Sequence, residues 1–167
     1  MFFRVATACV FSICAALPVL AQGAPQFSAI SAAKVAALME GKDSGLAQVA
    51  DVHGWPSPDT VVAHAVELNL APDQILIATK IKSDLERDAR DIGHAYLAVE
   101  AELEETFRSG RASPGNVQAL AKRSGELRAQ LRALQLSAHI KMRPNLTRAQ
   151  LEIFSRLPDV AASRTGG

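Results

Sequence analysis

The sequence predicts an all-α protein built on a long antiparallel helical hairpin flanked by short helices. Two long segments, 72–108 and the segment that runs from residue 114 to Arg143, place apolar residues three and four positions apart. This is the spacing of one face of an α-helix. Aromatic residues make up only 5% of a chain that is 49% hydrophobic, and much of the apolar content is alanine. A core built from alanine and aliphatic side chains favours packed helices over a sheet.

The first 21 residues have the organisation of a secretory signal peptide. Arg4 is the only charged residue before Lys34, and an apolar run at 5–20 precedes a Val-Leu-Ala segment at 19–21. These are the basic start, apolar stretch and cleavage site of exported proteins. The run contains Pro18 and is shorter than the roughly 20 residues that span a bilayer. The sequence therefore predicts cleavage after Ala21 and a periplasmic protein, with an uncleaved membrane anchor as the alternative.

The signal peptide would remove both cysteines, Cys9 and Cys14, from the mature chain. Their loss excludes a thiol nucleophile, a disulfide framework and a cysteine metal site. The charged residues are balanced, with 18 basic and 17 acidic side chains and a net charge of +1. Such a balance gives no global field that would attract nucleic acid or a membrane surface.

Residues 22–44 are predicted to be a flexible leader with one weak helix between Ser31 and Glu40, and residues 45–157 to be the helical domain. A strong helix start lies at 57–59 (Ser-Pro-Asp), where a serine cap precedes a proline and an acid. The apolar face expected for this helix consists of Val61, Val62, Ala65, Val66 and Leu68.

The longest helix is predicted to begin at Pro72 and to end near Arg108, with a length of about 55 Å at 1.5 Å per residue. A turn follows at 109–112, and Ser113 caps the partner helix. The two facing stripes give a coiled-coil-like seam, which predicts the hairpin. The stripe of the first helix contains Ala78, Ile81, Leu85, Ala89, Ile92, Tyr96, Val99, Leu103 and Phe107, and that of the second contains Val117, Leu120, Ser124, Leu127, Leu131, Leu134 and Ala138.

A short final helix is predicted after the hairpin. Thr147 and Gln150 have the spacing of a capping box, in which each side chain bonds the backbone amide of the other residue. Pro158 is expected to stop this helix, and residues 158–167 are predicted to be a disordered tail.

Two similar segments flank the predicted hairpin: Leu-Ala-Pro-Asp-Gln at 70–74 and Leu-Thr-x-x-Gln at 146–150. With the signal peptide, they resemble the Spy/CpxP family of bacterial periplasmic proteins, which is defined by paired Leu-Thr-x-x-Gln motifs and includes zinc-resistance-associated and heavy-metal-resistance proteins. The resemblance covers about residues 45–157, and the stretch 54–58 (Gly-Trp-Pro-Ser-Pro) is also similar to a branch of the family. Six residues match the family motif and are expected to act as structural caps of the helices: Leu70, Pro72, Gln74, Leu146, Thr147 and Gln150.

The resemblance implies an all-helical fold, often a curved dimer, and three roles: ATP-independent holding of envelope proteins, envelope-stress signalling, or metal binding. The chain departs from the motif at Ala71, where the family has threonine. The missing cap oxygen costs about 1 kcal/mol of helix stability.

No catalytic, cofactor-binding or metal-binding residues are predicted. None of the four histidines (His53, His64, His94 and His139) has a second histidine four residues later, and Gln135 stands four before His139. The chain has no nucleophile elbow, glycine-rich phosphate loop or paired carboxylate in a turn, so we expect no enzymatic activity and no cofactor. Trp55 is interpreted as a plug at the end of the bundle, with a client-contacting aromatic as the alternative.

Apolar residues just beside the seam are predicted to bind clients, and they are Leu76, Ile77, Leu97, Leu136 and Ile140. Apolar strips on a molecule of little depth usually mark a partner surface. The function expected from this pattern and the resemblance is that of a homodimeric periplasmic chaperone for non-native envelope proteins, with a stress-sensor protein as a further partner. The alternative is a heavy-metal-binding, metal-resistance or metal-sensor protein whose ligands come from two chains.

Overall fold

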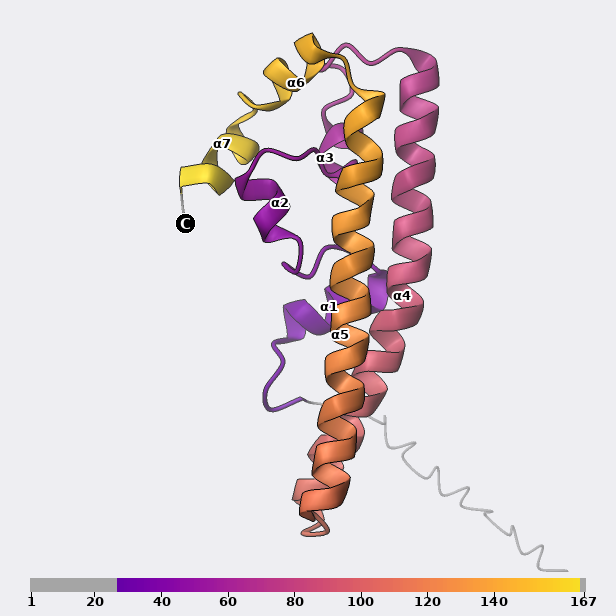
Figure 1. Ribbon diagram of the computed structural model, residues 1–167, viewed down its shortest axis with the longest axis vertical. Coiled ribbons are helices and arrows are strands. Elements are labelled where there is room, and N and C mark those ends of the chain that lie inside the picture. The colour runs from indigo at the N-terminus through magenta and orange to yellow at the C-terminus, as the bar shows by residue number, and fades with distance from the viewer. Residues whose placement is uncertain (1–26, 166–167) are drawn as a thin grey trace, which may run out of the picture.

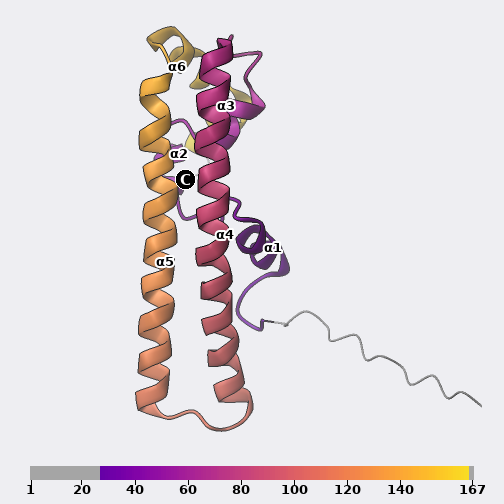
Figure 2. The same cartoon turned by 90° about the vertical axis from the view of Figure 1, so that its right-hand side faces the viewer.

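The computed structural model describes residues 27–165, and this part of the chain is all-helical, without a β-strand. Two long helices, α4 (Pro72–Arg108) and α5 (Pro114–Met142), dominate it. They lie side by side and run in opposite directions (Figures 1 and 2). The predicted all-helical class and the long helix pair are thus confirmed, while the signal peptide predicted at 1–21 lies outside the described residues.

The ends of both long helices agree with the sequence signals. Ser113 caps α5, since its side chain accepts a hydrogen bond from the Asn116 backbone amide, and proline follows each cap position at Pro72 and Pro114. Gly110 takes a left-handed conformation in the turn between the helices, with φ of 69°. Proline in the first turn and a left-handed glycine after a helix are favoured because neither disturbs the helical hydrogen bonds.

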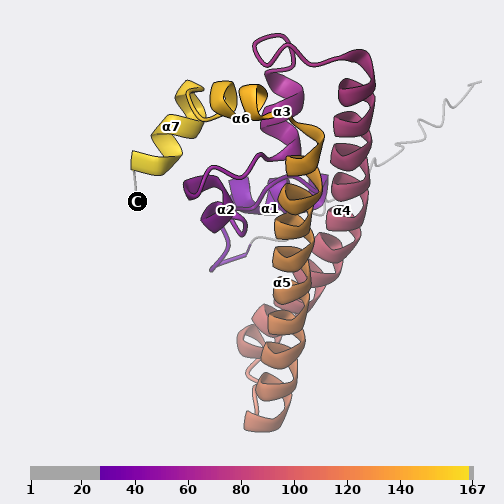
Figure 3. The same cartoon turned by 45° about the horizontal axis from the view of Figure 1, so that its top comes forward.

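The short helices gather along one part of the pair, away from the 109–113 turn (Figures 1 and 2). They are α1 (Ala32–Glu40), α2 (Gln48–Val52), α3 (Pro58–Ala63), the 3₁₀ turn η1 (Arg143–Asn145), α6 (Arg148–Phe154) and α7 (Pro158–Thr165). In the tilted view of Figure 3, α6 and α7 extend away from the pair and α2 lies beneath α7, in agreement with the contacts between α2 and α7.

Two apolar clusters hold these layers together. The first joins α3, α6 and α7 to the start of α4 and the end of α5, and its buried members are Val61, Leu68, Ala78, Met142, Leu146, Phe154, Leu157 and Val160. The second joins α1 to the middle of the pair, and its buried members are Leu38, Leu46, Ala89, Leu97 and Leu131. The core is therefore thin and aliphatic, as the composition predicts.

The weak helix predicted between Ser31 and Glu40 is present at residues 32–40, but it is packed against the long pair and is not part of a flexible leader. These residues form α1, which packs against α4. A Cβ atom at Gly93 of α4 would overlap the backbone carbonyl of Leu38, and one at Gly41 would overlap the carbonyl of Glu86. Glycines at both points let the two backbones touch, so α1 belongs to the helical domain.

The prediction of a disordered tail at 158–167 is wrong for residues 158–165, which form α7. Pro158 begins this helix instead of ending the preceding one, because proline fits the first turn, where its missing amide is not needed. Leu157 and Val160 are buried in the first apolar cluster. Their burial supplies the tertiary stabilisation that a helix of this length needs.

Gly93→Ala should destabilise the fold and loosen α1. Overpacking against a backbone atom typically costs about 1–3 kcal/mol, of which the better helix propensity of alanine returns at most about 1 kcal/mol. Urea unfolding measures the change, and hydrogen exchange at residues 38–42 reports the loosening. Gly125→Ala is the matched control, since a Cβ there meets nothing within 4 Å, and it should be neutral or stabilising. Equal stability of the two variants would contradict the close packing of α1.

Candidate functional site

The two motif glutamines bond directly to each other at the end of the helix pair where α4 begins. The side-chain amides of Gln74 and Gln150 form two reciprocal hydrogen bonds of 2.9 Å. Each carbonyl oxygen also accepts from the amide three residues earlier, at 3.0 Å from Ala71 N and 2.9 Å from Thr147 N. We call this pair of side chains the glutamine clasp.

The clasp also reaches the backbone of the opposite segment. Gln74 Nε2 donates to the Asn145 carbonyl at 2.7 Å, and Gln150 Nε2 donates to the Asn69 carbonyl at 3.3 Å. A primary amide has two N–H donors and an oxygen that accepts two bonds. All of this capacity is used in both glutamines, so the clasp is fully satisfied.

The other motif residues support the clasp. Leu146 is buried and Leu70 half-buried in the first apolar cluster. Thr147 Oγ1 accepts from the Gln150 amide at 3.3 Å, which completes the predicted capping box of α6. Ala71 has no side-chain oxygen, so only the glutamine half of the box exists at the start of α4.

The residues predicted to bind clients do not share one environment. Leu76 and Ile140 are exposed at 71% and 61% of their surface, and Ile77 is also exposed. Leu136 is half-buried. Leu97 is only 8% exposed because it lies in the second apolar cluster with Leu38 of α1. The prediction that Leu97 belongs to an open strip is therefore wrong.

The histidines lie apart from one another. His53 and His94 are exposed, and His94 Nε2 lies 3.3 Å from the Met39 carbonyl. His64 lies 3.4 Å from Asp159, whereas His139 is buried in α5. Within residues 27–165, no group of three histidine, cysteine or acidic side chains is placed to hold a metal ion.

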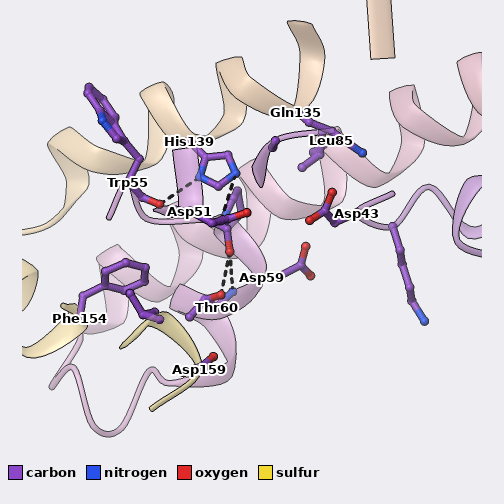
Figure 4. Close-up of a pocket in the computed structure, with 15 residues that line it drawn as sticks. Asp43, Asp51, Trp55, Asp59, Thr60, Leu85, Gln135, His139, Phe154 and Asp159 are labelled. Carbon is purple, nitrogen blue, oxygen red and sulfur yellow. Dashed lines mark hydrogen bonds and ion pairs between the residues drawn. The ribbon is translucent and has the colours of Figure 1, made fainter. Parts of the chain in front are cut away.

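A cavity of about 400 Å³ lies where α2, α3, α6 and α7 face the long pair (Figure 4). Its polar wall consists of Lys42, Asp43, Asp51, Ser57, Asp59, Thr60, Gln135, His139 and Asp159. Its apolar wall consists of Ala47, Trp55, Pro58, Leu85, Phe154 and Val160. The size lies within the range of small-molecule sites, about 300–1,000 Å³.

His139 and Trp55 close one side of this cavity. The His139 Nδ1 atom lies 3.1 Å from the Trp55 carbonyl oxygen and its Nε2 atom 3.9 Å from Asp51 Oδ1 (Figure 4). A carbonyl oxygen only accepts, so Nδ1 carries the proton in that bond. The Arg143 guanidinium stacks over the Trp55 ring, 4.8 Å from its centroid. Trp55 is therefore held at the end of α5.

Asp51 is the perturbed carboxyl of the cavity. Burial raises the pKa of its side chain above the usual value, and the nearby Asp43 carboxylate adds to this rise, while His139 opposes it. Desolvation and a second anion both disfavour the charged form. Asp51 therefore keeps its proton more readily than a solvated aspartate does.

Gln135 is the most deeply buried polar residue of the wall, with 3% of its surface exposed. Its Nε2 atom makes one long hydrogen bond, 3.5 Å, to Ser44 Oγ, and its Oε1 atom has no hydrogen-bond partner. In the sequence, Gln135 is notable only because it occupies the position four residues before His139, where a second histidine would stand. Its position one helical turn before His139 is the signal that both polar side chains share a face of α5.

Comparison of the chain with protein-family models, with curated proteins and with solved structures finds no match. The resemblance to the Spy/CpxP family thus stays a prediction. No helix within residues 27–165 has both the length and the apolar character that a membrane span requires.

Gln150→Leu should destabilise the protein by about 1–3 kcal/mol, because it removes both bonds between the two glutamine side chains and leaves the Thr147 amide without its partner. Gln74→Leu should act similarly, and the double variant should lose less than the sum, since neither glutamine is then left alone. Urea unfolding of the four proteins measures the coupling. Gln130→Leu, at an exposed position of α5, is the control, and strict additivity of the two clasp variants would contradict the clasp.

Asp51→Asn should become increasingly favourable as the pH rises. A raised pKa means that the native state binds this proton more tightly than the unfolded state, so the parent loses stability as the pH rises from about 3.9 through the native pKa. Asparagine does not titrate, so the variant lacks this loss. Thermal unfolding across that pH window gives the difference in stability. Asp91→Asn removes a carboxylate from the exposed surface of α4 as the control, and a difference that shrinks with rising pH would refute the assignment.

Proposed function

We propose that this chain is an exported envelope protein that holds non-native proteins without nucleotide. The observation that carries the proposal is the exposure of large aliphatic side chains on both long helices. Ile75, Leu76 and Ile77 are consecutive exposed residues near the start of α4, and Ile140 is exposed near the end of α5. We call these four residues the aliphatic set.

The aliphatic set lies beside a core that leaves it uncovered. Ala78 and Met142, its neighbours in sequence, are fully buried in the first apolar cluster. Burying a leucine or isoleucine side chain is worth about 1.5–3 kcal/mol. An apolar segment of an unfolded protein would gain this free energy here, and such contacts require no particular client sequence.

Charges of both signs flank the aliphatic set. Lys80 and Arg87 pair with Asp84 at 2.8 and 3.0 Å on the exposed face of α4. Exposed ion pairs of this kind contribute less than about 1 kcal/mol each. A rim of weak pairs keeps the surface soluble and adapts to varied clients, which supports broad and weak binding.

The proposal includes a Spy/CpxP-like arrangement and a homodimer in the bacterial periplasm. The long helix pair, the two Leu-x-x-x-Gln segments at its end and the signal-peptide pattern at 1–21 support this proposal. In the dimer, two helix pairs would form a shallow cradle around the aliphatic set. Sedimentation of the mature protein tests the oligomeric state.

Leu76→Glu and Ile140→Glu should each weaken the protection of an unfolding client against aggregation. Each replaces an apolar contact worth about 1.5 kcal/mol or more by a charge, which lowers apparent affinity about tenfold. Light scattering of a heated client measures protection by the parent and by each variant.

Gln118→Glu and Gln130→Glu add the same charge at exposed polar positions of α5 and are the controls. If the parent protected no client, the proposed function would be wrong. If the aliphatic variants stayed folded and protected as well as the controls, the binding surface would lie elsewhere. Zinc should leave protection unchanged, and stimulation by zinc would favour the metal-binding alternative.

A further inference from the structure

We propose that the cavity between the short helices and the long pair binds a small organic cation, a primary amine or guanidinium carried on a short hydrocarbon chain. Asp43 and Asp51 would accept hydrogen bonds from the cationic group. Gln135 would accept from a further N–H donor of the ligand. The apolar wall would cover the hydrocarbon chain. This site is separate from the aliphatic set.

The charge of the cavity points to a cation. Four aspartates line it, at positions 43, 51, 59 and 159. Lys42, which also lines the cavity, pairs with Glu40, and Lys82 pairs with Asp59 and Glu86. The basic group nearest to Asp51 is His139, whose Nε2 atom lies 3.9 Å away. Within residues 27–165, no lysine or arginine lies within ion-pair distance of Asp43 or Asp51. A bound ammonium or guanidinium would supply the missing positive charge.

The raised pKa of Asp51 agrees with this reading, since burial and the Asp43 carboxylate both disfavour its ionised form. A cation in contact with both carboxylates offsets the repulsion between Asp43 and Asp51, and so favours the ionised form of Asp51. Ligand binding would therefore draw part of its free energy from relief of the repulsion between the two carboxylates.

Gln135 is the second and independent sign of a ligand. It lines the cavity from α5, is almost fully buried, and has an acceptor atom, Oε1, without a donor. A buried polar atom that lacks its bond costs about 1–3 kcal/mol. The terminal torsion of a glutamine is soft, so an N–H donor placed in the cavity can draw Oε1 into a bond. Neutral apolar molecules would leave this atom unsatisfied.

The remaining walls define the rest of the ligand. Ala47, Leu85, Phe154 and Val160 provide apolar surface opposite the carboxylates. A volume of about 400 Å³ accommodates a chain of a few methylene groups with a polar group at each end. Ser57 and Thr60 add hydroxyl groups at the α3 side, where the second polar group would lie.

An organic cation fits the wall better than a metal ion. Metal ions require several ligand atoms at about 2.0–2.6 Å in a defined geometry, and no group of three candidate ligands occurs within the described part of the chain. Ammonium and guanidinium groups bond acceptors at about 2.7–3.2 Å over a wide range of directions. Acceptors from three different segments can therefore share one such group.

Isothermal titration calorimetry of the mature protein with cadaverine and agmatine tests the proposal, with pentanediol as the neutral isostere. We expect stoichiometric binding of at least one cation and no binding of the diol. Asp43→Asn and Asp51→Asn should each weaken binding about tenfold or more, as the loss of a charged hydrogen bond predicts. Gln135→Leu should also weaken binding, while Asp91→Asn, on the exposed surface of α4, should leave it unchanged.

Urea unfolding establishes that each variant is folded, and chemical-shift changes at Ala47, Thr60 and Val160 locate the ligand independently of the substitutions. Absence of binding to either cation, equal binding of the diol, or affinity unaffected by both aspartate variants would overturn the proposal. Binding of zinc in preference to the amines would replace it by a metal site. None of these residues belongs to the aliphatic set. A failure of cation binding would therefore leave the result of the aggregation assay unchanged, and a failure of client protection would leave cation binding unchanged.

Discussion

The glutamine clasp is the polar contact on which the arrangement of the short helices depends. Gln74 belongs to the first turn of α4 and Gln150 to the first turn of α6, so their mutual bonds join two helix starts that are 76 positions apart. The clasp also bonds the carbonyls of Asn69 and Asn145, which precede these helices. Because a half-satisfied buried amide is costly, the alternatives to this one geometry are penalised. Leu70 and Leu146 are thereby directed into the same apolar cluster.

The clasp orders the end of the bundle, but the elements that it gathers are too short to fill the space between them. α2 has 5 residues, α3 has 6 and α6 has 7. They leave a cavity of about 400 Å³ that is lined by four aspartates and is partly open to solvent. Such polar walls must be hydrated, paired or liganded, and the unpartnered Gln135 Oε1 shows that pairing within the described protein is incomplete.

The long helices were predictable because their signals are local. Serine, proline and glycine at 109–114 and the three-and-four spacing of the seam act over a few residues, and tertiary packing does not oppose them. The docking of α1 was not predictable, because it depends on Gly93, which in sequence reads only as a weak point of a helix. The burial of Leu97 followed from the same contact. The cavity was hidden for a similar reason, since Asp51 and His139 meet only in the folded chain.

The last turns of α5 show how one short segment serves three environments. Successive helical positions are rotated by about 100°, so neighbours in sequence face different surroundings. Gln135 and His139, four positions apart, line the cavity. Ala138 and Met142, also four apart, are buried, with Met142 in the first apolar cluster. Ile140 points to the opposite side of the helix from both pairs and is exposed. Only one peptide bond separates His139 from Ile140, yet substitutions in the cavity wall and at the exposed aliphatic position can be made independently. Neither position belongs to the buried face formed by Ala138 and Met142.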